Sequence, residues 1–144
     1  MDAMSEPTQA PHMSNRAIED AAVAYLLEWE AARGRPSRDT HNTGAAADVA
    51  NAHRTIEVKA YGGLARGQDL WLEPSQYTEG RDNPNFWLYV VENIRQGDPA
   101  RFRLLEIDGE TLRVMLVRAV ERRCFTVPWP VATYDELIRD QYPA

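Results

Sequence analysis

Cysteine is almost absent from the chain, and its scarcity excludes several kinds of chemistry. Cys124 is the single cysteine among 144 residues, so neither an internal disulfide nor a cysteine-based zinc cluster can form. One thiol in a chain of this length is typical of a reducing compartment, and we therefore expect a cytoplasmic protein. The three histidines, His12, His41 and His53, have no spacing that suggests a shared zinc ion.

Long hydrophobic runs are absent as well. No apolar stretch approaches the roughly twenty residues that a membrane span needs, and the N-terminus lacks the basic and apolar regions of a secretory signal. We expect a soluble protein that does not bind membranes. The hydrophobic content of 44% and the charged content of 26% are ordinary for a globular chain. A single domain with its own core is therefore expected.

Acidic residues outnumber basic residues in this chain. The formal net charge of −6 argues against broad, non-specific affinity for nucleic acid, although it leaves room for a local basic groove. Arg35 and Arg38 follow the first predicted helix and are candidates for contacts with phosphate groups. The alternative is a solvated basic loop without a ligand.

Lysine is the rarest charged residue of the chain. Lys and Arg together number 16, and Lys59 is the only lysine, which leaves 15 arginines. Lysine is a compact point charge whose pKa responds to its surroundings, and this suits a group that orients a water and neutralises a developing phosphorane. The alternative is that a single lysine is chance, and that Glu57 and Lys59 lie on an exposed strand face that carries an ion pair.

The stretch around this lysine predicts a β-hairpin. Small and β-branched residues at 46–50 and 55–60 flank a polar insert at 51–54. This pattern is typical of two short strands that are joined by a four-residue turn.

Strand geometry then predicts which side chains of the hairpin share a face. In this register Asp48 lies opposite Glu57, and Glu57 and Lys59 project to one side while Ile56 and Val58 project toward a core. Two carboxylates at cross-strand distance repel each other unless a positive charge lies between them. The arrangement therefore predicts a divalent cation, for which oxygen atoms are the preferred ligands.

The rest of the chain alternates between helical and strand patterns. Residues 1–13 contain too little apolar material to pack, so a disordered leader is expected before a domain at 14–144. Glu19 lies near the start of the first predicted helix, where it either faces an active site or complements the helix dipole. Residues 61–67 are expected to form a flexible loop at the mouth of the site. We expect helices at 14–33, 74–77, 112–120 and 133–140, and strands at 69–73, 86–91, 101–107 and 124–127.

Two segments of this chain, 56–59 (Ile-Glu-Val-Lys) and 87–91 (Trp-Leu-Tyr-Val-Val), carry a family resemblance. Together with the order of the predicted elements, they resemble the domain at the C-terminus of the plant protein NO VEIN. That domain is a branch of the PD-(D/E)XK, or restriction-endonuclease-like, nuclease superfamily. The likeness covers residues 14–140, and it implies an α/β fold with a mixed central sheet flanked by helices.

The resemblance also implies an activity, namely metal-dependent hydrolysis of DNA phosphodiester bonds in restriction, repair or defence. The implied site has Asp48, Glu57 and Val58 at the Mg²⁺ (or Mn²⁺) position, Lys59 beside the attacking water, Glu19 as an accessory acid, and Gln76 where an acidic residue is frequent. The implied partner is DNA, in a homodimer or with a partner protein of a larger nuclease or defence system. The alternative is a catalytically weak or inactive nuclease-like domain that serves as a binding module in such an assembly.

Overall fold

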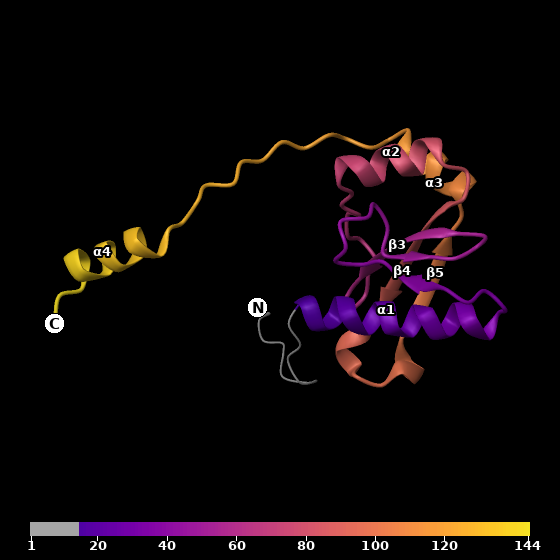
Figure 1. The fold of residues 1–144 in the computed structure, drawn as a ribbon, viewed down its shortest axis with the longest axis horizontal. Helices are drawn as coiled ribbons and strands as arrows, with labels where there is room; N and C mark the ends of the chain where they lie inside the picture. Colours follow the sequence, from indigo (N-terminus) through magenta and orange to yellow (C-terminus); the bar gives the residue numbers. More distant parts are fainter. Residues whose placement is uncertain (1–14) are drawn as a thin grey trace.

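The protein, seen here in a computed structural model that describes residues 15–144, has a mixed sheet between two layers of helices (Figure 1). The leader that the sequence predicts at 1–13 lies outside the described residues. The strands are β1 (Arg38–Asp39), β2 (Val49–Ala50), β3 (Thr55–Ala60), β4 (Phe86–Glu92) and β5 (Arg103–Ile107). The helices are α1 (Asn15–Ala32), α2 (Pro74–Asp82), α3 (Gly109–Leu116) and α4 (Val131–Gln141), with short 3₁₀ turns η2 (Ile94–Gln96) and η3 (Pro99–Arg101). The predicted α/β class is confirmed.

The sheet of the described residues has the order β1-β2-β3-β4-β5. Strands β3 and β4 run parallel, and the other neighbouring pairs are antiparallel. A parallel pair needs a crossover connection, which here passes through α2. Strand β4 lies between β3 and β5 and is buried along nearly its whole length, as its continuous apolar sequence predicts.

Helix α1 covers one face of the sheet with a stripe that repeats every four residues. Ile18, Ala22, Leu26 and Glu30 are all buried on this side. The apolar pattern also predicted Ala32 on the stripe, but Ala32 is exposed because the helix ends there. A buried glutamate therefore occupies the last position of an otherwise apolar face.

Helices α2 and α3 cover the opposite face, and each begins with a side-chain cap. The Gln76 side chain accepts a hydrogen bond from the Glu73 backbone N–H, and Asp108 Oδ1 accepts one from Thr111 N–H. A Cβ on Gly109 would lie 2.8 Å from the Pro84 carbonyl oxygen, so only glycine fits where α3 starts. The helix that the sequence predicts at 112–120 forms, but it runs from Gly109 to Leu116, so the prediction was wrong for residues 117–120.

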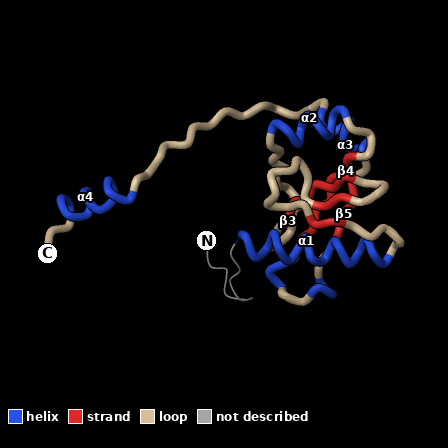
Figure 2. Tube along the Cα trace, viewed as in Figure 1, coloured by secondary structure: helices blue, strands red, loops and turns tan. Residues whose placement is uncertain are grey.

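Two predicted strands do not form. Residues 69–73 carry no strand pairing and lie in the connection from β3 to α2. Residues 124–127 lie in an extended, exposed segment with no neighbouring strand (Figure 2). A strand forms only beside another strand, and that requirement is not visible in the local sequence.

The loop after β3, predicted to be flexible, is tied to the end of β4 by backbone hydrogen bonds. Asn93 N–H donates to the Gly63 carbonyl at 2.9 Å, and Arg95 N–H donates to the Gly62 carbonyl at 2.9 Å. The buried carboxylate of Glu92 accepts the Ala65 N–H at 2.8 Å. A Cβ on Gly62 would lie 2.5 Å from the Arg95 guanidinium, whereas Gly63 has open space around it. The loop is therefore anchored to the end of β4 at these positions.

The C-terminal segment extends away from the sheet and its helices. A turn at 117–118 follows α3, residues 119–130 form neither helix nor strand, and α4 follows at a distance from the body (Figures 1 and 2). The predicted closing helix is confirmed, although it starts at Val131. None of the helices within the described residues combines the length and apolar character that crossing a membrane would require.

Candidate active site

The hairpin of β2 and β3 pairs Val49 with Ile56 and Ala50 with Thr55, in the register that the sequence predicts. Asp48, the residue before β2, donates its N–H to the Ile56 carbonyl at 2.9 Å, and its side chain lies beside Glu57. Asp48 Oδ2 accepts the Val58 backbone N–H at 2.9 Å. This bond points the Asp48 carboxylate along β3, toward Glu57.

Glu57 is buried, with 4% of its surface exposed. Its Oε2 lies 3.0 Å from Lys59 Nζ, whereas Oε1 has no hydrogen-bond partner among the described residues. Burial raises the pKa of Glu57 to about 8; the Lys59 ammonium opposes this rise and the neighbouring Asp48 carboxylate adds to it. The alternative of an exposed strand face with a solvated ion pair is therefore wrong for Glu57.

Lys59 is held between the two layers that meet at this site. Its ammonium lies 3.0 Å from Glu57 and 3.4 Å from Gln76 Oε1, at the first turn of α2. The Lys59 side chain keeps 20% of its surface exposed, so solvent reaches the ammonium. The structure thus brings together Asp48, Glu57, Lys59 and Gln76 from two elements that are separate in the sequence.

The donor set is small. Within residues 15–144, no group of three or more His, Cys, Asp or Glu side chains is placed to hold a metal ion. On this face of the sheet, the carboxylates of Asp48 and Glu57 are the acidic ligands available to a metal ion. Mg²⁺ keeps several water ligands and commonly binds through one or two carboxylates together with substrate phosphates, so this set fits that ion. The unpartnered Glu57 oxygen is the atom that a cation would satisfy.

Comparison with known families supports the resemblance. Residues 18–105 match the family model described as "Protein NO VEIN, C-terminal". The chain belongs to this family. The matched part of this NO VEIN C-terminal domain runs from α1 to β5, so it contains the four residues of the site and excludes α3 and α4. Neither curated proteins nor solved structures gave a match.

Glu19 is not brought to the site of the NO VEIN domain. It is exposed on α1, which packs against the sheet face that carries Ile56 and Val58. Glu57 and Lys59 project from the opposite face, because side chains alternate along β3. Glu19 therefore lies away from Glu57 within the described structure. It also lies beyond the first turn of α1 as described, so its position does not support a role in the helix dipole.

The two arginines predicted to touch phosphates have different environments. Arg35 is bound to Glu30 through two parallel contacts, Nε to Oε1 at 2.6 Å and a terminal nitrogen to Oε2 at 2.9 Å. A guanidinium that is paired in this way with a buried carboxylate has a structural role, so we no longer propose Arg35 as a DNA contact. Arg38 is exposed on β1, at the edge of the sheet.

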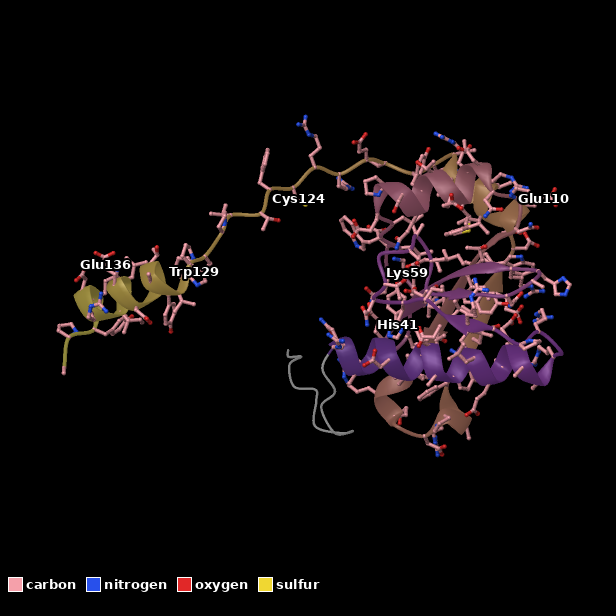
Figure 3. All side chains as sticks on the ribbon, in the orientation of Figure 1. His41, Lys59, Glu110, Cys124, Trp129 and Glu136 are labelled. Carbon is pink, nitrogen blue, oxygen red and sulfur yellow. The ribbon has the colours of Figure 1, made fainter. Side chains whose placement is uncertain are left out.

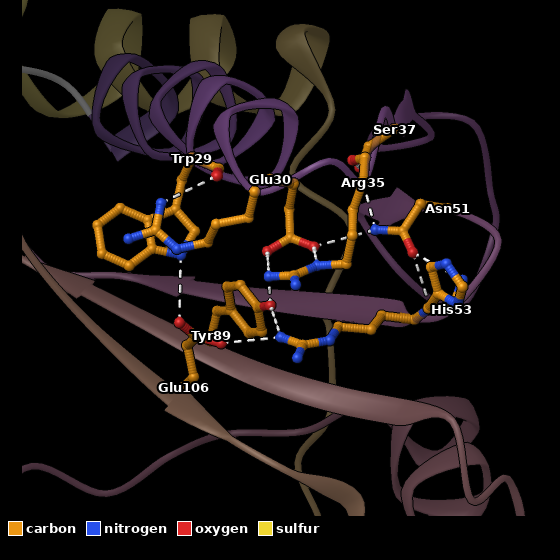
Figure 4. Close-up of polar contacts among 10 residues, drawn as sticks. Trp29, Glu30, Arg35, Ser37, Asn51, His53, Tyr89 and Glu106 are labelled. Carbon is orange, nitrogen blue, oxygen red and sulfur yellow. Dashed lines mark hydrogen bonds and ion pairs between the residues drawn. The ribbon is translucent and has the colours of Figure 1, made fainter.

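Glu30 is the central residue of a polar network that sequence analysis missed (Figure 4). It is fully buried, and it accepts hydrogen bonds from Arg35, from the Tyr89 hydroxyl at 2.8 Å and from Asn51 Nδ2 at 3.1 Å. Burial acts to raise the pKa of Glu30, but the bonds from Arg35 and Tyr89 and the charges of Arg35 and Arg54 lower it below its ordinary value. Glu30 is therefore held as a carboxylate in the core.

This network determines the shape of the hairpin turn. Asn51 Oδ1 accepts the backbone N–H groups of both His53 and Arg54 at 2.8 Å. Arg54 in turn donates to Glu106 at 2.8 Å and stacks 3.6 Å from the ring centre of Trp87. The turn that sets the β2–β3 register is thus fixed by Glu30 and β4–β5. A four-residue spacing after Leu26 is the sequence signal that could have placed Glu30 inside.

A first prediction concerns the pH dependence of stability without metal. The folded-state pKa of Glu57, about 8, lies above its ordinary value of 4.5. Between these values the folded state keeps a proton that the unfolded state has lost, so the free energy of unfolding falls as pH rises. The slope approaches about 1.4 kcal/mol per pH unit. Glu57→Gln should remove this slope, as measured by urea unfolding with chelator from acid to mildly alkaline pH.

The exposed carboxylate of Glu28 on α1 provides the control. Glu28→Gln should leave the wild-type slope in place. Parallel stability curves for the wild type and Glu57→Gln across this pH range would show that Glu57 ionises normally in the fold.

Proposed function

We propose that this domain is a divalent-metal-dependent phosphodiesterase that hydrolyses DNA, as expected for a PD-(D/E)XK nuclease. The observation that supports the proposal most is the buried Glu57, whose free oxygen lies beside a second carboxylate and a lysine. A buried carboxyl oxygen without a hydrogen-bond partner costs folding free energy, and groups of this kind with strongly shifted pKa values cluster at functional sites. No feature of the core requires one here.

Asp48 and Glu57 are the residues that would hold Mg²⁺ or Mn²⁺. A bound ion would polarise the phosphodiester and acidify the attacking water. Val58, which was predicted at the metal position, presents a buried apolar side chain to the α1 face, and its N–H orients Asp48. Val58 therefore acts through the direction of the Asp48 carboxylate.

Lys59 is the residue we assign to charge stabilisation. Glu57 and Gln76 hold its ammonium from two sides, at 3.0 Å and 3.4 Å, so little reorganisation is needed when negative charge develops on a phosphate. Gln76 is fixed in turn by the Glu73 N–H at 2.9 Å, which makes it a positioning residue. Arg38 remains the proposed phosphate contact outside this centre. The single thiol favours the cytoplasm as the place of action.

The second candidate is a binding module in a restriction, repair or defence assembly, without catalysis of its own. It is favoured by the small donor set, since two carboxylates are fewer than many metalloenzyme sites provide. It is also favoured by the net charge of −6, which opposes strong binding to DNA. A measurement of metal binding distinguishes the nuclease from the binding module.

A second prediction therefore concerns metal and thermal stability. Mg²⁺ or Mn²⁺ should raise the melting temperature, because a ligand at 100 times its Kd adds about 2.7 kcal/mol to the folded state. Asp48→Asn should abolish this rise. In chelator and at a pH above the Glu57 pKa of about 8, the same variant should melt higher than the wild type, because the repulsion between the two ionised carboxylates is removed. Differential scanning calorimetry with and without metal measures both effects, alongside cleavage assays on DNA and RNA.

Glu28→Gln again serves as the control and should respond to metal as the wild type does. If the wild type shows no heat of metal binding and melts at the same temperature with metal and with chelator, the binding-module candidate replaces the nuclease.

A further inference from the structure

The segment from 117 to 144 exposes an unusual amount of apolar surface. We call it the C-terminal arm. No residue of α4 is buried, although Val131, Tyr134 and Ile138 form a stripe along one side of this helix. Trp129 packs edge-on against Tyr134 at 6.1 Å and still has 65% of its surface exposed. An amphipathic helix of this kind gains most of its stability from a partner surface.

An apolar groove lies on the body of the same chain. It has a volume of about 540 Å³ and is formed between the loop after β3 and the face of β4–β5. Leu64, Leu70, Val90, Leu105 and Ile107 contribute its apolar lining. Leu105 is 50% exposed although it belongs to a strand, so this part of the sheet lacks the cover that α2 and α3 give to its neighbours.

Charge is complementary between these two surfaces. Helix α4 carries three acidic residues against one basic residue, Arg139. The groove is bordered by the exposed side chains of Arg66 and Arg103, and Glu92 pairs with Arg103 at 2.6 Å. An acidic amphipathic helix therefore matches a groove with an apolar floor and basic rim.

The segment that joins the arm to the body favours a partner chain over the chain's own groove. Residues 117–130 run away from the body, and Figure 3 places Cys124, Trp129 and Glu136 well apart from the part that contains Lys59. Pro128 and Pro130 restrict themselves and the residues before them to extended conformations. An extended connection that ends in a stiff segment directs α4 outward.

We infer that the arm of one chain packs α4 into the groove of a second copy, and that the second copy returns its own arm. Reciprocal exchange of an identical element is a low-cost route to a twofold dimer. The four exposed aromatic residues of the arm would bury on the order of 500 Å² per chain. Together with the aliphatic residues, this approaches the roughly 800 Å² per partner of a specific interface.

The test uses paired variants of the full chain and light scattering after size-exclusion chromatography. Ile138→Asp places a charge on the apolar stripe of α4, and Leu105→Asp places one in the groove. Both positions are at least 41% exposed, so the body should stay folded, and circular dichroism checks this. The matched controls place the same charge elsewhere, with Ala132→Asp on the polar side of α4 and Val114→Asp on the exposed side of α3.

The wild type and both controls should have the mass of two chains, and each test variant alone should have the mass of one. A mixture of the two test variants should recover a heterodimer, because one intact arm then meets one intact groove. A dimeric Leu105→Asp variant would overturn the groove as the docking site and indicate that α4 packs on α4. A wild type that stays monomeric at all concentrations would overturn the exchange and indicate an arm that folds back.

Discussion

Glu30→Ala is expected to lower the free energy of unfolding by about 3–5 kcal/mol, the usual cost of removing one partner from a buried ion pair. The variant leaves the Arg35 guanidinium, the Tyr89 hydroxyl and the Asn51 amide without their common acceptor. It also creates a cavity beneath the end of α1. Urea or thermal unfolding at neutral pH measures the loss.

The exposed pair of Arg81 and Asp82 supplies the control, since both side chains are more than half exposed. Arg81→Ala should change the free energy of unfolding very little, because this ion pair is exposed to solvent. The folded-state pKa of Glu30 is lowered, so its contribution is present above the ordinary value of 4.5 and is lost as pH falls through the folded-state pKa. The gap between wild type and Glu30→Ala should therefore narrow in acid. Equal losses for Glu30→Ala and Arg81→Ala would show that the network contributes no more than a surface pair.

Lys59→Ala is expected to lower DNA turnover by on the order of 10²-fold or more, as is typical when one preorganised charge is removed from a site that stabilises a transition state. The pH and the metal concentration of this comparison matter, because Lys59 also affects the ionisation of Glu57. Lys59 opposes the rise in the pKa of Glu57, so its removal favours the proton that competes with metal there. Turnover should be compared at saturating metal and at a pH well above 8, because the pKa of Glu57 is about 8 in the wild type and is higher without Lys59.

Under those conditions metal and DNA affinity should change little, because the interaction is stronger in the transition state than in the ground state. Lys59→Arg should rescue little, since a planar guanidinium does not fit the space between Glu57 and Gln76 that an ammonium fills. Arg101→Ala, which removes an exposed cation on η3, is the control and should retain full turnover. Wild-type cleavage rates in the Lys59→Ala variant would exclude the proposed role of the lysine.

The predictable part of the fold consists of local patterns. The apolar repeat of α1, the continuous apolar run of β4 and the polar turn at 51–54 each carry their own signal, and each forms where expected. The two predicted strands at 69–73 and 124–127 do not form, and the reason is the same for both. Both segments have strand-like residues, but a strand forms only where the fold brings it alongside another strand, which other parts of the chain decide.

The candidate site likewise has features that the sequence predicts and features that depend on the fold. The register that sets Asp48 against Glu57, and the face that Glu57 shares with Lys59, follow from the period of two in a strand and were present in the sequence. Contact of Lys59 with Gln76 depended on the crossover through α2. Glu19 lies on the other side of the sheet from Glu57 and Lys59, because α1 packs against the opposite face.

The sequence by itself determined the elements, the hairpin register and the membership of the family, because these depend on neighbours along the chain. Only the tertiary structure decided that Glu57 is buried with a free oxygen, that Arg35 belongs to Glu30, and that the arm has no cover in its own chain. Tyr89 reaches Glu30 across 59 residues of sequence. Burial and charge at such a contact are set by segments that the chain brings together only on folding, so no local pattern could contain them.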